Sequence, residues 1–157
     1  MPKLAANFSM MFQEVDMVER FALAASVGFT GAEIQNPYGH TSDKIGQAYR
    51  EHGLEAVLFN VPTAIGALVG READFETGFA RALEYCTAAG CRQVHCLAGR
   101  ADDGRAEETF VANLRRASPE ARRLGVRLLV EPLNTHDNPG YFLTGSVQAR
   151  RLIDLVG

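Results

Sequence analysis

The 157-residue sequence contains no tryptophan, only three cysteines, and no apolar run near the ~18 residues needed to cross a bilayer. Positive charge is also not in excess: 16 lysines and arginines stand against 19 aspartates and glutamates, for a net charge of −3. Proteins that bind duplex nucleic acid normally present a basic face. We therefore expect neither nucleic acid nor a membrane as a partner. The first residues lack the apolar stretch and cleavage site of a secretory signal, so the expected location is the cytoplasm.

Familiar nucleotide-binding and cysteine motifs are missing as well. No glycine-rich turn follows the first predicted strand, where residues 7–12 read Asn-Phe-Ser-Met-Met-Phe, and no phosphate-loop pattern occurs. Cys86, Cys91 and Cys96 are odd in number and lack the two-residue gap of a zinc knuckle or redox pair. We expect them to be buried free thiols.

One pattern recurs along the chain: a helix with apolar residues on one face, a glycine, and a short apolar strand. Glycine is favoured just past a helix because it adopts the left-handed conformation without steric cost. The predicted strands are residues 4–8, 31–35, 54–60, 93–97 and 126–131, and the first four helices end at Gly28, Gly53, Gly90 and Gly125. The predicted helix caps are Thr41 or Ser42, Asp74, and Thr144 or Ser146, and Pro119 predicts a kink or split near Ser118.

Five strand–helix units in strict alternation predict a parallel sheet covered by helices, in one α/β domain of residues 1–157. Barrels of eight such units carry their chemistry at the carboxyl ends of the strands and need roughly 200 residues or more. The sequence therefore predicts a partial TIM (β/α) barrel, about five βα units of an eight-unit barrel. Polar residues stand where its strands end: Asn7, Gln35, Asn36, Asn60 and Glu131.

Glu131 is the first candidate for chemistry. A carboxylate at the end of an apolar strand has to be paired, bound to a metal or open to a cavity, because burying it alone is too costly. Pro132 turns the chain directly afterwards. Such a carboxylate suits a hard divalent cation or general base catalysis, and an ion pair with an arginine of a neighbouring strand remains the alternative.

The other titratable residues are less informative. Glu33 could point into the barrel, and its role is open between structure and function. We expect His95 to be an interior histidine with its hydrogen bonds satisfied, with a substrate contact as the alternative. We expect His136 and Asp137 to be loop residues, because no serine or cysteine lies in a nucleophile elbow.

Several short motifs follow one another along nearly the whole chain. They are residues 7–12, 28–33, 37–38, 60–62 and 96–99, and the strongest is Glu131-Pro132-Leu133-Asn134 followed by Asp137, Pro139-Gly140 and Leu143-Thr144-Gly145. In this order they resemble the hydroxypyruvate isomerase family, one of the xylose-isomerase-like barrels, which also include sugar epimerases and endonuclease IV.

The resemblance implies an intramolecular aldose–ketose isomerase. Its substrate would be hydroxypyruvate, converted to 2-hydroxy-3-oxopropanoate, or a related 2-oxo acid such as 2-oxo-tetronate. The reaction passes through an enediolate, stabilised by a divalent metal ion, Mg²⁺ or Mn²⁺. Glu131 matches the family's first catalytic and metal-binding glutamate. We expect Asn7, Tyr38, Asn60 and Asn134 to line the substrate pocket from the same edge of the sheet.

Two departures from the family pattern leave alternatives open. The family's other metal ligands and its second catalytic glutamate come from later strands that this sequence does not contain. The family also has a longer loop, with an Asp-Trp pair, where residues 63–69 here lead straight to Arg71. Arg71 is expected to be an exposed residue at a helix start, with a substrate clamp as the alternative. The other functions considered are a sugar epimerase of the same superfamily and an inactive truncated module that self-associates into a homo-oligomer through open sheet edges.

Overall fold

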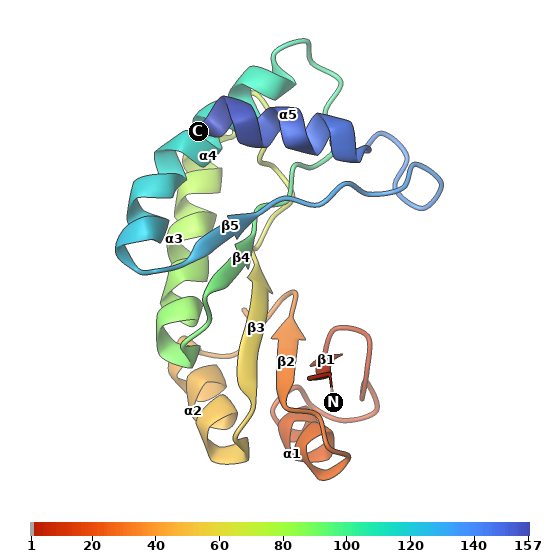
Figure 1. Ribbon diagram of the computed structural model, residues 1–157, viewed down its shortest axis with the longest axis vertical. Helices are drawn as coiled ribbons and strands as arrows, with labels where there is room; N and C mark the ends of the chain where they lie inside the picture. Colours follow the sequence, from red (N-terminus) through yellow and green to blue (C-terminus); the bar gives the residue numbers. More distant parts are fainter. Residues whose placement is uncertain (1) are drawn as a thin grey trace.

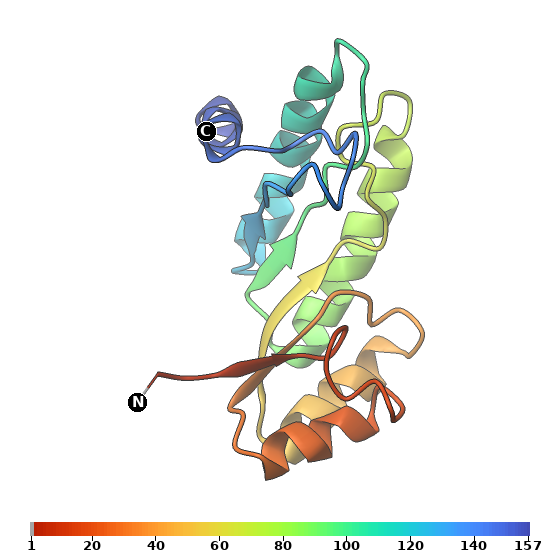
Figure 2. The same ribbon diagram turned by 90° about the vertical axis from the view of Figure 1, so that its right-hand side faces the viewer.

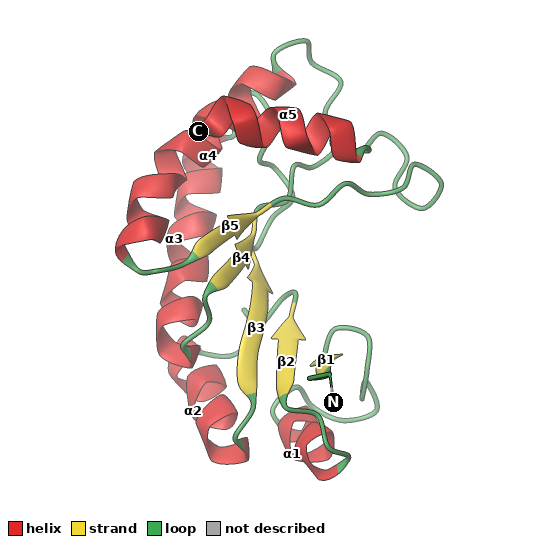
Figure 3. Cartoon of the chain, in the orientation of Figure 1, coloured by secondary structure: helices red, strands yellow, loops and turns green. Residues whose placement is uncertain are grey.

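The computed structural model describes residues 2–157, so that Met1 of the predicted domain lies outside it, and contains one five-stranded parallel sheet (Figures 1 and 3). The strands occur in chain order, β1-β2-β3-β4-β5, and every neighbouring pair is parallel. This is the wall of a partial TIM barrel, as predicted. The elements are β1 (Ala5–Asn7), α1 (Glu19–Ser26), β2 (Gly31–Ile34), α2 (Ser42–His52), β3 (Glu55–Asn60), α3 (Glu72–Ala89), β4 (Gln93–His95), α4 (Ala106–Arg123), β5 (Arg127–Leu129) and α5 (Ser146–Val156).

Helices α1 to α4 cover one face of the sheet and leave the opposite face free of helices (Figures 1 and 2). The hydrophobic core lies between these two layers, where aromatic rings meet edge to face. Phe21 of α1 lies 4.8 Å from Tyr49 of α2 and 4.9 Å from Phe8, measured between ring centroids. The Tyr49 hydroxyl donates to the backbone oxygen of Ala32 at 2.9 Å, so its one polar atom is satisfied inside the core.

Four of the five strands end earlier than the sequence predicts, β1 and β2 by one residue and β4 and β5 by two. β4 ends at His95 and β5 at Leu129, because beyond these residues the chain turns into loops. The last bond between them joins the Cys96 amide to the Leu129 oxygen at 2.9 Å. Glu131 therefore stands two residues beyond the end of its strand.

The helix boundaries agree with the sequence in part. The Thr41 hydroxyl accepts a hydrogen bond from the Lys44 amide at 3.3 Å and caps α2, as predicted. The predicted cap at Asp74 is wrong: α3 begins at Glu72, and Asp74 pairs with Arg71 across the first turn. The predicted cap of α5 is also wrong. Neither Thr144 nor Ser146 caps it, and the Gln148 side chain accepts from the Thr144 amide instead.

The split predicted at Pro119 does not occur, since α4 runs unbroken from Ala106 to Arg123. A proline inside a helix removes one backbone hydrogen bond and crowds the preceding turn. Here the apolar side of α4 is buried on both sides of the proline, at Leu114 and Ala121. This packing holds the two halves of the helix together.

The three cysteines are free and buried, as predicted. Gly90 ends α3 in the left-handed conformation, with a φ of 70°, and the Cys91 amide donates back to the Cys86 oxygen at 2.9 Å. This is the hydrogen bond of a Schellman turn. None of the helices formed by residues 2–157 is long and apolar enough to cross a membrane.

Gly46 sets the contact between α2 and α3, and its replacement gives a test of the fold. A Cβ at Gly46 would lie 2.3 Å from the backbone oxygen of Ala88. We expect Gly46→Ala to lower the free energy of unfolding, because overpacking costs about 1–3 kcal/mol and outweighs the gain of ~1 kcal/mol in helix propensity. Urea unfolding measures the difference. Gly39→Ala is the control, since nothing lies within 4 Å of its added Cβ; equal stability of the two variants would contradict the tight contact.

Candidate active site

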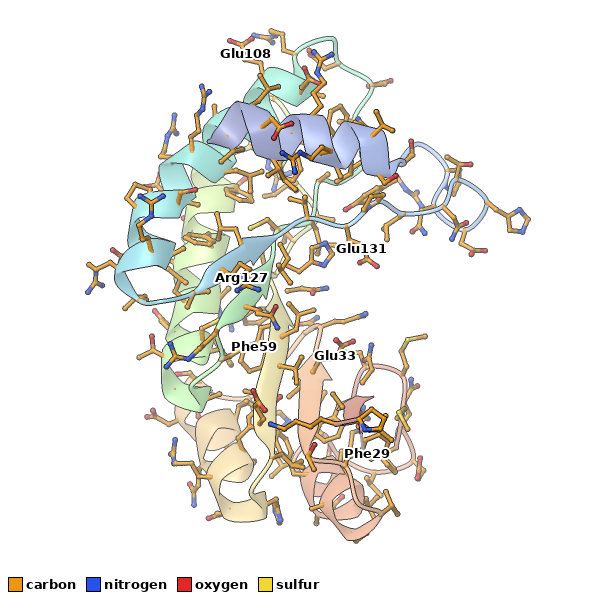
Figure 4. All side chains as sticks on the ribbon, in the orientation of Figure 1. Phe29, Glu33, Phe59, Glu108, Arg127 and Glu131 are labelled. Atoms are coloured by element: carbon orange, nitrogen blue, oxygen red, sulfur yellow. The ribbon has the colours of Figure 1, made fainter. Side chains whose placement is uncertain are left out.

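Polar side chains from neighbouring strands meet at the carboxyl ends of β1 and β2. Asn7 and Glu33 are partners in the parallel register, and the Asn7 side-chain amide donates to Glu33 Oε1 at 2.5 Å. Figure 4 shows Glu33 and Glu131 on the face of the sheet that α1 to α4 do not cover. The register therefore brings residues that are distant in sequence to one edge of the sheet, which we call the rim.

A second group at the rim joins β3, β4 and the loop after β5. Asn60 and His95 are register partners, and His95 Nδ1 lies 3.2 Å from Asn60 Oδ1. The same nitrogen lies 3.9 Å from Glu131 Oε2. Burial lowers the pKa of His95, while the negative charge of Glu131 acts in the opposite direction. The imidazole is therefore neutral at pH 7.

The expectation that His95 is fully satisfied is wrong. Its Nε2 atom is buried and has no hydrogen-bond partner within the described part of the chain. The side chain is only 6% exposed, so the ring lies under the surface of the rim rather than in front of it. Burial of the ring explains the unpaired Nε2, because a buried atom cannot reach solvent and no polar group of the described residues bonds it.

Glu131 is more open than the sequence predicts. Its side chain is 62% exposed, because the β5 ladder ends at Leu129 and the chain has already left the sheet. The predicted burial of Glu131 does not occur, and the choice between a partner, a metal ion and an open cavity for its carboxylate stays a prediction. The predicted alternative, an ion pair with an arginine, does not form within residues 2–157, where the basic group within 4 Å of the Glu131 carboxylate is the neutral ring of His95.

The two carboxylates influence each other. The pKa of Glu33 is raised, mainly because the group is partly buried and secondly because of the negative charge of Glu131. A carboxyl group whose pKa is raised by burial and by a neighbouring negative charge is typical of acid–base sites. At the rim, the exposed Glu131 suits the role of base, and Glu33 holds a proton more readily than a free glutamate.

Tyr38 lies next to Asn60, and its hydroxyl donates to the Asn60 backbone oxygen. Its ring packs edge to face on Tyr85 with the centroids 4.9 Å apart, and the Arg81 guanidinium lies 4.8 Å from the ring centroid. Burial raises the pKa of Tyr38 well above its usual range. The hydroxyl of Tyr38 thus stabilises the end of β3. Its role in a substrate pocket stays a prediction.

Asn134 is the predicted site residue that the structure does not join to the others. Its side-chain amide donates to Asp137 Oδ2 at 3.0 Å, and its oxygen accepts from the Asp137 amide at 2.9 Å. Both residues are exposed in the loop after β5. In this structure Asn134 shapes that loop, and none of its hydrogen bonds within residues 2–157 reaches Asn7, Tyr38 or Asn60.

Tyr141 and Asn113, for which no role was predicted, hold the loops of the rim together. The buried Tyr141 hydroxyl accepts from the Ala98 amide at 3.0 Å and so ties the loop after β5 to the loop after β4. The Asn113 amide of α4 donates to the Gly66 oxygen in the segment after β3 at 2.9 Å. An available signal was Asn113 itself, a polar residue on the otherwise apolar side of a helix.

The segment after β3 is fastened to the loop after β4 by backbone contacts. Gly66 and Ala67 donate to the oxygens of Leu97 and Ala98 at 3.0 and 2.8 Å. Gly99 has a φ of 88°, and a Cβ there would lie 2.1 Å from the Ala64 oxygen. The tight approach explains the glycine at the end of the motif of residues 96–99.

Two hollows on the helix-covered side lie elsewhere. One of about 610 Å³ runs between α3 and α4 over Phe75 and Phe79, and one of about 760 Å³ lies between β5, α4 and α5. Neither is lined by a predicted site residue. The candidate active site is therefore defined by the chemistry of the rim, and its groups are carboxylate, amide and imidazole.

The raised pKa of Glu33 predicts a pH-dependent gain from Glu33→Gln. Above the folded pKa the wild-type carboxylate is ionised at a cost to the fold, whereas glutamine is neutral and still accepts from Asn7. In chelator-treated protein we expect the variant to be more stable at pH 7, by less than about 1 kcal/mol because solvent screens a half-exposed pair. The gain should disappear near pH 4. Urea unfolding at both pH values measures it, with exposed Glu14→Gln as control; a loss of stability at pH 7 would contradict the repulsion.

Comparison with known proteins supports the resemblance that the motifs indicate. The chain is 37% identical to hydroxypyruvate isomerase of Escherichia coli (strain K12), an alignment that covers 100% of this chain and 66% of that protein. It is 38% identical to 2-oxo-tetronate isomerase of Cupriavidus necator, with 100% and 65% covered. The chain thus spans just under two thirds of the length of these relatives. The alignment with the first runs over 169 positions, more than the 157 residues of this chain, so the relative has extra residues within the matched part.

Solved structures agree with this placement. A crystal structure named AP endonuclease, family 2, from Brucella melitensis superposes with a TM-score of 0.96 at 40% identity, covering 100% of this chain and 65% of that one. L-ribulose 3-epimerase superposes with a TM-score of 0.78 at 18% identity, covering 100% and 58%, and shares the fold. Residues 21–157 match the family model described as xylose isomerase-like TIM barrel. The sequence motifs, the parallel sheet and these matches together show that the chain belongs to the xylose isomerase-like TIM barrel family.

Proposed function

We propose that this chain carries part of the active site of an aldose–ketose isomerase that acts on a small 2-oxo acid in the cytoplasm. The substrate is hydroxypyruvate or a related acid such as 2-oxo-tetronate. The observation that carries the proposal is the exposed carboxylate of Glu131 beside Glu33 and His95 at the rim. Its support is the 37–38% identity to proteins named hydroxypyruvate isomerase and 2-oxo-tetronate isomerase.

The reaction needs a base that removes a proton from one carbon and returns it to the neighbouring carbon. In hydroxypyruvate, the proton leaves the carbon that bears the hydroxyl group, and an enediolate forms. Reprotonation at the former carbonyl carbon, with transfer of the hydroxyl proton to the former carbonyl oxygen, yields the aldehyde isomer. Glu131 suits the role of base, because its exposed carboxylate can reach a substrate at the rim. We propose that Asn7, Tyr38, Asn60 and Asn134 bind the substrate's oxygens from the same side.

The metal ion that the family implies, Mg²⁺ or Mn²⁺, is compatible with the kind of ligand at the rim. Such ions prefer oxygen ligands, and Glu131 and Glu33 bring carboxylates there. No group of three His, Cys, Asp or Glu side chains in residues 2–157 lies close enough to hold a metal ion. The described residues therefore fall short in ligand number, and we propose Glu131 as one ligand of a set whose other members residues 2–157 do not supply. A bound ion would stabilise the developing oxyanion.

Two other functions are distinguished by experiment. A sugar epimerase would use the same proton transfer on a longer substrate, and the shared fold of L-ribulose 3-epimerase is the observation behind it. Self-association is favoured by the sheet, since β1 and β5 each pair with a single neighbouring strand and an open edge invites pairing with another copy. The net charge of −3 argues against a nucleic-acid substrate.

The direct test is isomerisation by the purified chain. Hydroxypyruvate, 2-oxo-tetronate and D-allulose are each supplied with Mg²⁺ or Mn²⁺, then with a chelator, and sedimentation is measured in parallel. Turnover of a 2-oxo acid that the chelator stops supports the proposal. Turnover of the sugar alone would favour the epimerase, and concentration-dependent dimers without any turnover would favour the self-associating module.

Glu131→Gln tests the assigned base. We expect kcat to fall by about 10²–10⁴-fold, the usual contribution of a general base. The fold should be retained, because the Glu131 side chain is largely exposed. Glu76→Gln, a matched change on the exposed side of α3, is the control and should leave kcat unchanged. Wild-type turnover by the Glu131 variant would rule out its role as base.

A further inference from the structure

His95 is a buried polar residue at the rim that the proposed reaction does not use. It is the last residue of β4, and its backbone is held by the Val61 amide, which donates to the His95 oxygen at 2.9 Å. Its side chain is 6% exposed, so the ring does not face a substrate. One ring nitrogen, Nδ1, faces the rim, and the other, Nε2, is buried without a partner in the described residues.

The surroundings of Nδ1 decide where the ring proton lies. Both atoms near it are oxygens, Asn60 Oδ1 at 3.2 Å and Glu131 Oε2 at 3.9 Å, and a carboxylate oxygen only accepts. The single proton of a neutral imidazole therefore belongs on Nδ1, where it has acceptors. Nε2 then carries no proton and is an unpaired acceptor in the interior. The opposite tautomer would cost more, because its N–H would be unpaired at Nε2 while the unprotonated Nδ1 faced two oxygens.

Glu131 needs such a neighbour. Its carboxylate lies beyond the end of β5 and is 62% exposed. Within residues 2–157, the basic side chain that lies within 4 Å of it is His95. The charge of Glu33 repels it. At 3.9 Å, Nδ1 lies beyond hydrogen-bond distance of Glu131 Oε2, so the attraction between the ring N–H and the carboxylate is electrostatic.

We propose that His95 is a positioning residue, whose Nδ1–H holds Asn60 Oδ1 and orients the carboxylate of Glu131 at the rim. The proposal rests on the proposed function, since it assigns the direction of the catalytic base. His95 touches neither substrate nor reacting atoms. It acts from beneath the rim, through the one ring nitrogen that faces outward.

Three substitutions separate this role from a merely structural one. Asparagine places an amide near the position of Nδ1, glutamine places one near Nε2, and leucine fills the space without any donor. We expect His95→Leu and His95→Gln to lower kcat by up to about 10²-fold, the cost of a misplaced catalytic group, with little change in KM. His95→Asn should restore most of the activity. His52→Asn, at the carboxyl end of α2 on the opposite edge of the sheet, is the control.

The position of the ring proton is measured without any turnover. Nitrogen-15 NMR of the histidine rings, assigned with His95→Asn, should show His95 protonated at Nδ1 and bare at Nε2. A proton on Nε2 would overturn the proposal, as would equal loss of kcat in the Asn and Leu variants of a well-folded protein. Absence of turnover by the wild type overturns the proposed function, and with it the effect of His95 on catalysis. If the wild type shows no turnover but NMR finds the proton on Nδ1, the proposed function is wrong and the proposed geometry of His95 is right.

Discussion

Parallel pairing of the strands determines where this molecule can carry out chemistry. Two parallel neighbours can be joined only by a connection that returns the chain to its starting edge, and here α1 to α4 make those returns. All the strands consequently end on the same side. Asn7 and Glu33 become neighbours by register, as do Asn60 and His95, and all four lie at or near the ends of their strands. The loop after β5 adds Glu131 to the same edge.

The helices decide the chemistry of the rim indirectly. Because they cover one face of the sheet with apolar side chains, such as Phe21 and Tyr49, a polar strand residue on that face would be buried in the core without partners. At the rim the side chains balance opposing charges. Glu33 and Glu131 repel one another, while the neutral His95 and the amide of Asn7 offer donors to them.

Much of the architecture was predictable from local patterns. Alternating helices and strands, with glycine at the helix ends, predicted the parallel sheet, and the polar residues at the strand ends predicted the rim. Features that depend on tertiary packing were not predictable. The burial that keeps α4 continuous through Pro119 comes from the layers around it. The unpaired nitrogen of His95 and the pairing of Asn134 with Asp137 depend on which atoms meet in three dimensions. The substrate roles of Asn7, Tyr38, Asn60 and Asn134 stay predictions.

The fastening of the loops has a mechanical consequence for the rim. Ala98 accepts from Ala67 through its oxygen and donates through its amide to Tyr141, so the loops after β3, β4 and β5 share this one residue. These three loops are therefore joined to one another on one half of the rim. The loop after β1 is joined to β2 instead, where the Gln35 amide donates to the Ser9 hydroxyl at 3.0 Å. The loop after β2 is bonded to β3 in turn, through the Tyr38 hydroxyl and the Asn60 oxygen, so a substrate would meet a rim whose loops are joined from β1 to β5.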